Sequence, residues 1–586
     1  MDFKSRRSTR ILIAILMIKI AALAVAVIAL LVRMSQLQLQ VAQKPVQVHR
    51  RQILPVNPSE SPEAALWPLP ASFSFGATTV HFSRNIEFIT VGHHSKRLAD
   101  SVERYRKLMF IGGCLYSEDN STIIVLNVTH SDNNSPLEHL SENYSLHVPS
   151  DGSEVRIHSE SSVGAIRALE TLSQLIKPSS KLPVVGLRSK CESHSLESTF
   201  VINNAPWTID DKPRFKHRGL LLDTSRHFIE KYTIFKILDG MAATKLNVFH
   251  WHIVDAQSFP LVSLKYPQLS AKGAYSEFEV YSPEDVREVI EFASNRAIRV
   301  IPELDVPGHT FSWGLSTGLV VCPNKQPWSR YCAEPPCGQL DITRNATYSF
   351  LEGLLSEQAA IFLDSYFHLG SDEVNEHCYL EDDGVSKFLK DRKWTVDNLL
   401  QFFQNRMQDI IRASGKTPVY WEEVVLDHNV SLPHDSVIQA WKGFESIKNI
   451  AEKGYRVIAS PADAWYLDCG RGSFVYSGNS WCDPFKNWGI MHAYDPTEGL
   501  TEKEASKVIG GEVAMWTELA DDTNVQDLIF PRAAAAAEAL WSAKNTQDWN
   551  KTAHRLDVLR SILVSRDIKA SPIWPQWCTG NSCANV

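Results

Sequence analysis

Two adjacent carboxylates, Asp372 and Glu373, end the stretch His-Leu-Gly-Ser-Asp-Glu at residues 368–373. Like charges at close quarters cannot both ionise freely, so one of the two carboxyls keeps its proton to higher pH. A carboxyl that is still protonated near neutral pH can protonate a leaving group. An isolated Asp-Glu pair more often marks the N-terminus of a helix, so its chemical meaning depends on the residues expected around it.

Aromatic and charged side chains recur where other strands are expected to end. Indole faces pack against the apolar face of a pyranose and against a methyl group. Charged hydrogen bonds to hydroxyls fix the orientation of a sugar. The pattern predicts a carbohydrate site, formed by the aromatic residues Trp421, Trp441, Trp465, Tyr466 and Trp516 and the polar residues Arg226, Asp255, Asp468 and Glu518.

Short apolar strands alternate with longer helices from residue 215 onward. Such alternation indicates a parallel sheet. Eight candidate strands favour an α/β fold of the (β/α)8 TIM barrel type, in which the C-terminal strand ends form one ring that carries the active site. An open doubly wound sheet is the alternative, but no Gly-x-Gly-x-x-Gly follows a strand to favour its dinucleotide-binding version. The expected strands are 218–223, 246–254, 299–304, 367–370, 419–422, 436–441, 456–460 and 511–516, and the expected helices are 234–245, 283–296, 347–362, 396–413 and 531–541.

A small α+β domain is expected over residues 63–205, before a barrel domain over residues 206–586. Its expected strands are 122–128, 144–148 and 154–158. A helix is expected over 163–176, because apolar residues recur there at helical spacing.

The first 62 residues have the pattern of a membrane module. A basic tail at 1–10 precedes an apolar run at 11–32, which is long enough to cross a bilayer as a transmembrane signal anchor, and 33–62 is expected to be a flexible stem. Basic residues before the span predict a cytosolic N-terminus and a lumenal body. We therefore expect a single-pass type II membrane protein of the secretory pathway, in the Golgi or plasma membrane. A cleaved signal peptide is the alternative.

Two further patterns agree with a lumenal body. The chain has ten cysteines, an even number, and the short spacings Cys332 to Cys337 and Cys578 to Cys583 suit disulfides in an oxidising compartment. Seven Asn-x-Ser/Thr sequons predict N-glycosylation at Asn120, Asn127, Asn133, Asn143, Asn345, Asn429 and Asn550.

The net charge of −8 and the lack of a long basic stretch outside the N-terminus argue against a nucleic-acid partner. His250 and His252 have His-x-His spacing on one expected strand, which can bind a metal. Because no further cluster of zinc type accompanies them, no metal site is predicted. No cofactor is expected, and a homodimer is left open.

The chain resembles the β-N-acetylhexosaminidases of glycoside hydrolase family 20. The segments that carry the resemblance occur in the same order as in the family and begin with Arg-Gly-Leu-Leu-Leu-Asp-Thr-Ser-Arg-His at 218–227. The others are Lys-Leu-Asn-Val-Phe-His-Trp-His at 245–252, Pro-Gly-His at 307–309, Asp372-Glu373, and Ala-Glu-Ala-Leu-Trp-Ser at 537–542. The α+β domain is similar to the small non-catalytic domain of the family.

The resemblance implies an exo-acting enzyme that removes terminal non-reducing N-acetylglucosamine or N-acetylgalactosamine from glycans such as N-glycans and chito-oligosaccharides. Its mechanism would retain the configuration of the anomeric carbon and would be substrate-assisted, with an oxazolinium intermediate formed by the acetamido group. Most glycosidases instead use two carboxylates of the enzyme. Glu373 would be the general acid and then the base, Asp372 would hold the acetamido N–H, and Tyr466 would donate to the acetamido oxygen.

The remaining roles also follow from the resemblance. Trp421, Trp441 and Trp516 would wall the acetamido pocket, whereas Arg226, Asp468 and Glu518 would bind the outer hydroxyls and close the pocket. Asp255 and His309 would support Glu373. The resemblance also implies a disulfide between Cys322 and Cys378, and makes Cys583 the expected partner of Cys578.

Three positions depart from the family pattern. Ser371 stands where a second Gly is usual, and we expect it to be tolerated. Ala256 follows Asp255 where relatives often carry a second Asp. Cys469 follows Asp468 where the sulfate-tolerant lysosomal form has Arg, which makes a preference for 6-sulfated sugars doubtful.

Two other functions remain as alternatives. A catalytically silent, membrane-tethered glycan receptor would need no acid, so the intact Asp372, Glu373 and Tyr466 argue against it. An endo-acting chitinase of related mechanism would need an open cleft, and the expected closing residues Arg226, Asp468 and Glu518 argue against that.

Overall fold

The structure, a computed structural model of the chain, describes residues 66–82, 85–110, 121–132, 135–178, 200–543 and 548–579. All of them belong to one compact unit, Gln52–Val586. The expected tail, membrane span and stem lie outside these residues, as do Asn120, Asn133 and Cys583. None of the helices within the described ranges is long and apolar enough to cross a membrane.

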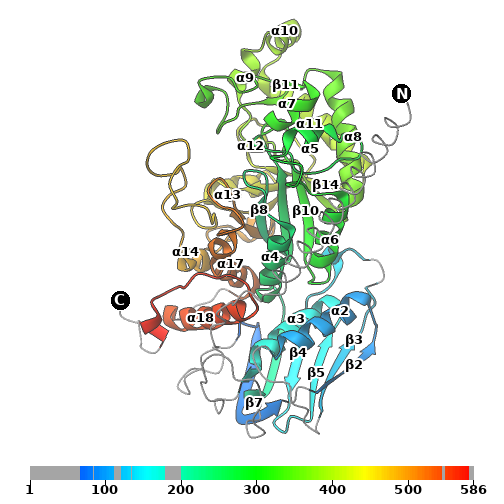
Figure 1. Cartoon of the computed structure of the whole chain (residues 1–586), viewed down its shortest axis with the longest axis vertical. Helices are drawn as coiled ribbons and strands as arrows, with labels where there is room; N and C mark the ends of the chain where they lie inside the picture. Colours follow the sequence, from blue (N-terminus) through cyan, green and yellow to red (C-terminus); the bar gives the residue numbers. More distant parts are fainter. Residues whose placement is uncertain are drawn as a thin grey trace, which may run out of the picture. The chain divides into compact units, whose positions relative to one another are not determined.

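A seven-stranded sheet forms the first part of the described chain (Figure 1). The strand order is β1-β7-β4-β5-β3-β2, and β6 pairs with β7. The predicted strands 122–128 and 144–148 are confirmed as β3 and β4, and the predicted 154–158 as β5 with one more residue. The bounds are β1 Ser72–Phe82, β2 Ile86–Gly92, β3 Thr122–Val128, β4 Tyr144–Val148, β5 Glu154–Ser159, β6 Lys177–Pro178 and β7 Phe200–Asp211.

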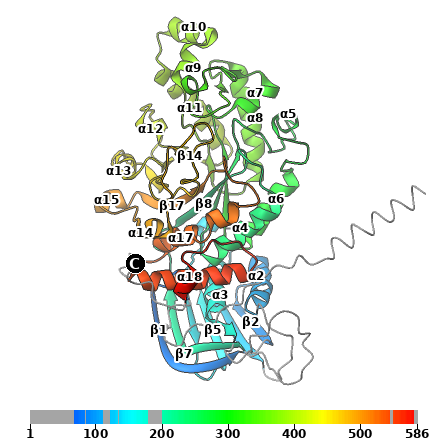
Figure 2. The same ribbon diagram turned by 60° about the vertical axis from the view of Figure 1, so that its left-hand side comes forward.

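Helices α2 (Lys96–Leu108) and α3 (Ser162–Leu175) lie between this sheet and the barrel (Figure 2). Every residue of α3 is buried, as expected for a helix that is covered on both sides. The hydroxyl of Ser161 caps its N-terminus by accepting hydrogen bonds from two backbone N–H groups. Arg167 of α3 donates to the carbonyl oxygen of Ala297, which comes just before a barrel strand begins. The α+β layer therefore packs against the N-terminal ends of the barrel strands.

The predicted barrel is confirmed as a closed ring of eight strands in the order β10-β13-β14-β15-β16-β17-β8-β9. All neighbouring pairs are parallel. An open doubly wound sheet is thereby excluded. The bounds are β8 His217–Asp223, β9 Val248–Val254, β10 Arg299–Leu304, β13 Tyr366–His368, β14 Thr417–Trp421, β15 Val437–Ala440, β16 Arg456–Ala459 and β17 Val508–Met515.

Helices follow the strands along the chain and cover the ring (Figure 1). The predicted helix 396–413 is confirmed to the residue, and the others agree within a few residues at each end. α6 begins at Pro283 because Ser282 and Asp285 form a capping box at its N-terminus. The main helices are α4 Lys231–Ala243, α6 Pro283–Ser294, α8 Asn345–Ile361, α11 Val396–Ala413, α13 Phe444–Glu452, α17 Arg532–Trp541 and α18 Trp549–Ser565.

Strand β13 is shorter than predicted and ends at His368 rather than at residue 370. Gly370, Ser371 and Glu373 have φ angles of 61°, 71° and 50°, so the backbone leaves the extended region there. A Cβ on Gly370 would lie 1.8 Å from Oδ1 of Asp305, so only glycine fits. This left-handed turn points the Asp-Glu pair out of the end of the barrel.

Strand β7 crosses the expected domain boundary between residues 205 and 206. Residues 207–211 pair with β1 and β4 and belong to the first sheet. Pattern alone could not place this boundary, because β7 runs on toward β8 with only a short connection.

Candidate active site

The predicted site residues lie on the segments that follow the C-terminal ends of the barrel strands, as a barrel active site requires. Arg226 follows β8, Asp255 follows β9, and His309 follows β10. The other segments carry Asp372 and Glu373 after β13, Trp421 at the end of β14, Trp441 after β15, Tyr466 and Asp468 after β16, and Trp516 and Glu518 after β17.

Glu373 is partly exposed and is backed by the imidazole of His309, which is mostly buried. Its side chain is 33% exposed, and its Oε2 lies 3.3 Å from Nε2 of His309. The other ring nitrogen of His309, Nδ1, lies 3.0 Å from Oδ1 of Asp255. Burial lowers the pKa of His309, but the charges of Asp255 and Asp305 outweigh it and raise the pKa well above its ordinary value. A solvent-accessible carboxyl is thus held against a cationic, oriented partner.

Asp372 carries a buried acceptor without a partner. Its Oδ1 is buried and makes no hydrogen bond among the described residues. Burial, and then the charge of Asp305, raise the pKa of Asp372 well above its usual range. Burial likewise raises the pKa of Asp305 to about 7. The free Oδ1 is therefore positioned to accept a hydrogen bond from a bound molecule.

Ser371, one of the departures from the family pattern, is accommodated. Its hydroxyl donates to the carbonyl oxygen of Val306 at 2.6 Å and accepts from Nε2 of Gln404 at 2.9 Å. Its backbone N–H donates to Oδ1 of Asp305 at 2.8 Å. Because the hydroxyl both donates and accepts a hydrogen bond, it is not left buried without a partner.

Four aromatic rings form a connected cluster at the same end of the barrel. Trp421 contacts Trp516, Trp516 contacts Tyr466, and Tyr466 stacks on Trp441, with ring centroids 6.2, 6.3 and 6.4 Å apart. These rings belong to one hydrophobic cluster that is separate from the main barrel core. The indole N–H of Trp421 donates to Glu303 at 2.8 Å, which fixes that ring.

Trp465 lies apart from this cluster and belongs to the main core. It is fully buried, and its indole N–H donates to the carbonyl oxygen of Met491 at 3.0 Å. Neighbouring residues in an extended segment point to opposite sides, so Tyr466 faces the site while Trp465 faces away. This corrects the expectation that Trp465 binds substrate.

Arg226 is the centre of the polar side of the site. Its guanidinium lies 3.1 Å from Asp255 and 2.7 Å from Glu334, and 5.1 Å from the centre of the Trp516 ring. Burial raises the pKa of Asp468 to about 7, and its Oδ1 is buried without a partner among the described residues. Burial also raises the pKa of Glu518 well above its usual range, against the opposing charge of Arg226.

Two residues of the site were missed by sequence reasoning. Glu334 reaches Arg226 from a loop closed by the Cys332–Cys337 disulfide, whose short spacing was noted. Trp481 packs its edge on Trp441 and Tyr466 from a loop held by the Cys469–Cys482 disulfide. That pairing was not predicted. The even cysteine count and a tryptophan beside Cys482 were the available signals.

The other disulfide predictions fare as follows. The Cys322–Cys378 bond is confirmed and joins the segments that precede and follow the catalytic turn. Cys578 is disulfide-bonded, and its predicted partner, Cys583, lies outside the described residues.

His250 and His252 are tied to carboxylates. Ligand atoms of His250, Glu303 and His368 lie within 4.8 Å of one another, one of several such groups in the described residues. However, both ring nitrogens of His252 are hydrogen-bonded to carboxylates, Glu303 at 2.6 Å and Asp255 at 2.7 Å. His252 therefore has no nitrogen left for a metal.

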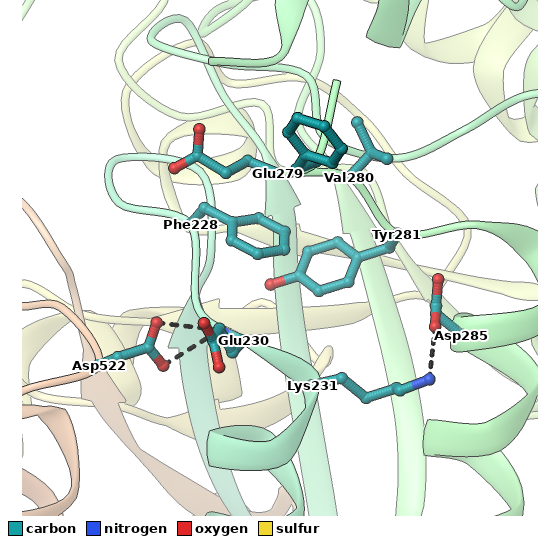
Figure 3. A pocket seen from close by; sticks show the side chains of 9 residues that line it. Phe228, Glu230, Lys231, Glu279, Val280, Tyr281, Asp285 and Asp522 are labelled. Carbon is teal, nitrogen blue, oxygen red and sulfur yellow. Dashed lines mark hydrogen bonds and ion pairs between the residues drawn. The ribbon is translucent and has the colours of Figure 1, made fainter. Parts of the chain in front are cut away.

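A separate hollow of about 450 Å³ lies outside the ring, beside the N-terminal ends of α4 and α6 (Figure 3). Phe228 and Tyr281 stack in it, 4.8 Å apart, and Lys231 pairs with Asp285 at 2.5 Å. None of the predicted site residues lines this hollow. The candidate active site is therefore the cluster of aromatic rings and carboxylates at the C-terminal end of the barrel, and not this outer hollow.

A (β/α)8 barrel with a carboxylate pair, a tryptophan cluster and unpartnered acidic acceptors at its C-terminal end defines a glycoside hydrolase. Residues 215–544 match the family described as "Glycosyl hydrolase family 20, catalytic domain", and residues 66–175 match "beta-acetyl hexosaminidase like". The chain belongs to glycosyl hydrolase family 20 and is a glycosidase of the β-N-acetylhexosaminidase class.

Relatives resemble the chain over most of its length. The chitooligosaccharidolytic β-N-acetylglucosaminidase of Bombyx mori is 37% identical over 460 residues, covering 75% of this chain and 74% of that protein. The β-hexosaminidase 1 of Arabidopsis thaliana is 36% identical over 541 residues, covering 88% and 92%. The Vibrio harveyi family 20 exo-β-N-acetylglucosaminidase in complex with N-acetylglucosamine superposes with a TM-score of 0.72 at 25% identity, over 89% of this chain and 80% of that one.

Proposed function

We propose that this glycosidase removes single terminal, non-reducing N-acetylglucosamine or N-acetylgalactosamine residues from β-linked glycans, including N-glycans and chito-oligosaccharides. The observation that carries the proposal is the juxtaposition of Glu373, held by His309, with the unpartnered Oδ1 of Asp372. An acid beside an acceptor for an amide N–H fits a sugar that carries an acetamido group.

The first step uses the substrate as its own nucleophile. The acetamido oxygen attacks the anomeric carbon while the proton of Glu373 passes to the glycosidic oxygen, which leaves as an alcohol. Asp372 accepts a hydrogen bond from the acetamido N–H and offsets the positive charge of the oxazolinium. Tyr466 donates a hydrogen bond to the acetamido oxygen. Holding the nucleophile within the substrate gives it a high effective concentration.

The second step reverses the role of Glu373. Its carboxylate takes a proton from a water molecule, which attacks the anomeric carbon and opens the oxazolinium with retention of configuration. A cavity of about 20 Å³ borders Glu373, His309 and Glu334, and a space of this size can hold one water molecule.

Exo action follows from the polar side of the site. Arg226, Asp468 and Glu518 would bind the outer hydroxyls of one sugar, and the unpartnered Oδ1 of Asp468 is a ready acceptor. Trp421, Trp441 and Trp516 would wall the acetamido group. A site closed by charged side chains leaves no path for a second sugar on the non-reducing side.

Substrates with a weakened acetamido group test this mechanism. Fluorine on the acetyl methyl draws electrons from the amide oxygen, so turnover of aryl β-N-acetylglucosaminides should fall steeply from acetyl to trifluoroacetyl. A rate that is insensitive to fluorination would mean that a group of the enzyme, not the substrate, attacks. Cleavage of long chitin in mid-chain would refute exo action.

We also propose, from the sequence, that residues 11–32 anchor the enzyme as a type II membrane protein with a lumenal catalytic domain. The sequon residues Asn127, Asn143, Asn345 and Asn429 are exposed, which is compatible with glycosylation. Full-length protein should resist alkaline extraction from membranes and shift in mobility on treatment with an N-glycosidase. Extraction into the soluble fraction would contradict the anchor.

A further inference from the structure

Three imidazoles in the barrel each lie between two carboxylates. His250, on β9, has Nδ1 2.9 Å from Oε2 of Glu512 and Nε2 3.0 Å from Oε2 of Glu303, the second as an ion pair without hydrogen-bond geometry. His252, two residues on, donates to Glu303 at 2.6 Å and to Asp255 at 2.7 Å. His309 lies between Asp255 and Glu373.

These contacts form one continuous series that leads to Glu373. In order, its members are Glu512, His250, Glu303, His252, Asp255, His309 and Glu373. All of them except His309 and Glu373 are less than 2% exposed. Because β9 alternates its side chains, His250 and His252 both point to the inside of the barrel, which brings the series from the interior to the active-site end.

The geometry at His252 determines its charge. A neutral imidazole has one N–H, so a ring that is hydrogen-bonded to a carboxylate at both nitrogens must carry both protons. Burial lowers the pKa of His252, but the charge of Glu303 and the bond to Asp255 raise it to about 10. Burial raises the pKa of Glu303, but the charges of His368, His252 and His250 hold it well below its usual range.

We propose, on the basis of the function proposed above, that this series is a single ionic chain and that His252 is a positioning residue for the catalytic acid. His252 holds Asp255, Asp255 orients His309, and His309 stabilises the carboxylate that Glu373 becomes when it gives up its proton. The only other cation within ion-pair distance of Asp255, among the described residues, is Arg226 at 3.1 Å. Loss of His252 would leave Asp255 free to turn toward Arg226.

Glu303 is the branch point of the chain. It faces His250 and His252 from β9, His368 from β13 at 3.1 Å, and Trp421 from β14. His368 contacts the same carboxylate but lies off the route to Glu373, because its Nδ1 accepts a hydrogen bond from the N–H of Gly370. His368 is therefore a matched control for His252.

The test compares His252→Gln with His368→Gln on two substrates. Chitobiose has a poor leaving group that needs protonation, whereas a 2,4-dinitrophenyl β-N-acetylglucosaminide has one that leaves without help. His252→Gln should lower kcat on chitobiose by about 10- to 100-fold, the usual range for a residue that orients another. On the dinitrophenyl substrate kcat/KM should stay close to the wild-type value, because kcat/KM reports the first step and leaves out the base role of Glu373 in the second. His368→Gln should change activity on the two substrates to the same extent, because His368 holds the turn before Asp372 but lies off the route to Glu373.

Equal losses on the two substrates would overturn the proposal, because a purely structural defect does not depend on the leaving group. An unchanged rate on chitobiose would also overturn it. If His252→Gln does not fold, Glu303→Gln, which keeps an acceptor for Trp421, should show the same dependence on leaving group. Lack of turnover by the wild-type enzyme on both substrates would instead refute the proposed function itself.

Discussion

Trp481 stands at the open side of the aromatic cluster. It is 68% exposed, yet its edge packs against Trp441 and Tyr466 with centroid distances of 5.3 and 5.8 Å. A large ring held in place but left in water is suited to stack on a further part of the substrate. In an exo-acting enzyme that part is the sugar on the leaving-group side.

Trp481→Ala should weaken the binding of chito-oligosaccharides more than that of aryl glycosides. The loss of one stacking contact is worth about 1 kcal/mol, which corresponds to a roughly fivefold rise in KM, with kcat little changed. Steady-state kinetics on chitotriose and an aryl substrate measure it. Phe278→Ala, which removes an 84% exposed ring in the outer hollow, should change neither constant. A fall in kcat with KM unchanged would contradict this role.

At the scale of single residues, the site residues near the strand ends were easier to predict from the sequence than the loop residues that contact them. Asp372, Glu373, Tyr466 and three tryptophans were predicted because they lie at or within a few residues of the ends of apolar strands. Glu334 and Trp481 lie in long loops whose paths depend on disulfides, and neither has a local pattern. Trp465 was misplaced because its spacing from the strand differs by only one residue from that of Tyr466, and only the backbone decides which of the two faces the site.

The strands and helices were predictable because their buried positions are occupied mainly by apolar residues. β8 and β9 are buried at every residue, and a largely apolar stretch is typical of a parallel barrel strand that is covered on both faces. The end of β13 could not be predicted, since three left-handed residues stop it where the pattern continues. The histidines of β9 were noted for possible metal binding, but two of their carboxylate partners, Glu303 and Glu512, come from other strands and could not be paired with them from the pattern.

The two histidines of strand β9 should make the protein less stable as the pH rises into the alkaline range. The pKa of His250 is raised to about 9 and that of His252 to about 10, because Glu512 and Glu303 outweigh the effect of burial. The folded state thus binds protons that the unfolded state releases near pH 6.5. Their stabilisation is complete below about pH 6.5 and is lost as the pH rises through these folded-state values.

Urea denaturation at pH 6, 8 and 10 measures this effect. The free energy of unfolding should fall across the series, and His252→Gln should show a smaller fall than the wild type. An unfolding free energy that stays constant from pH 6 to pH 10 would mean that these imidazoles are not charged in the folded protein.

At the scale of the whole molecule, the α+β layer is tied to the barrel by buried charges. Glu142 accepts two hydrogen bonds from Arg218 of β8, at 2.8 and 2.6 Å, and one from Arg167 of α3, at 2.8 Å. The side chains of Arg218 and Arg167 are 0% and 1% exposed. One carboxylate therefore neutralises two arginines at the junction between the two layers.

Glu142→Ala should destabilise the protein by about 3 to 5 kcal/mol, because it leaves buried charge uncompensated. Chemical denaturation measures the loss, and the folded variant should retain its kcat because the junction lies at the end of the barrel opposite the active site. Asp391→Ala, which breaks the exposed pair with Lys387, should cost less than about 1 kcal/mol. Equal costs for the two changes would show that the junction is not held by these charges.

The most direct test of Glu373 as the acid of this N-acetylhexosaminidase is turnover of an aryl β-N-acetylglucosaminide by purified protein of residues 63–586 and by its Glu373→Gln variant. We expect turnover by the wild type and a loss of kcat of about 10²- to 10⁴-fold in the variant, with substrate binding retained. A well-folded wild type that binds the glycan without cleaving it, or a variant as active as the wild type, would contradict this role of Glu373.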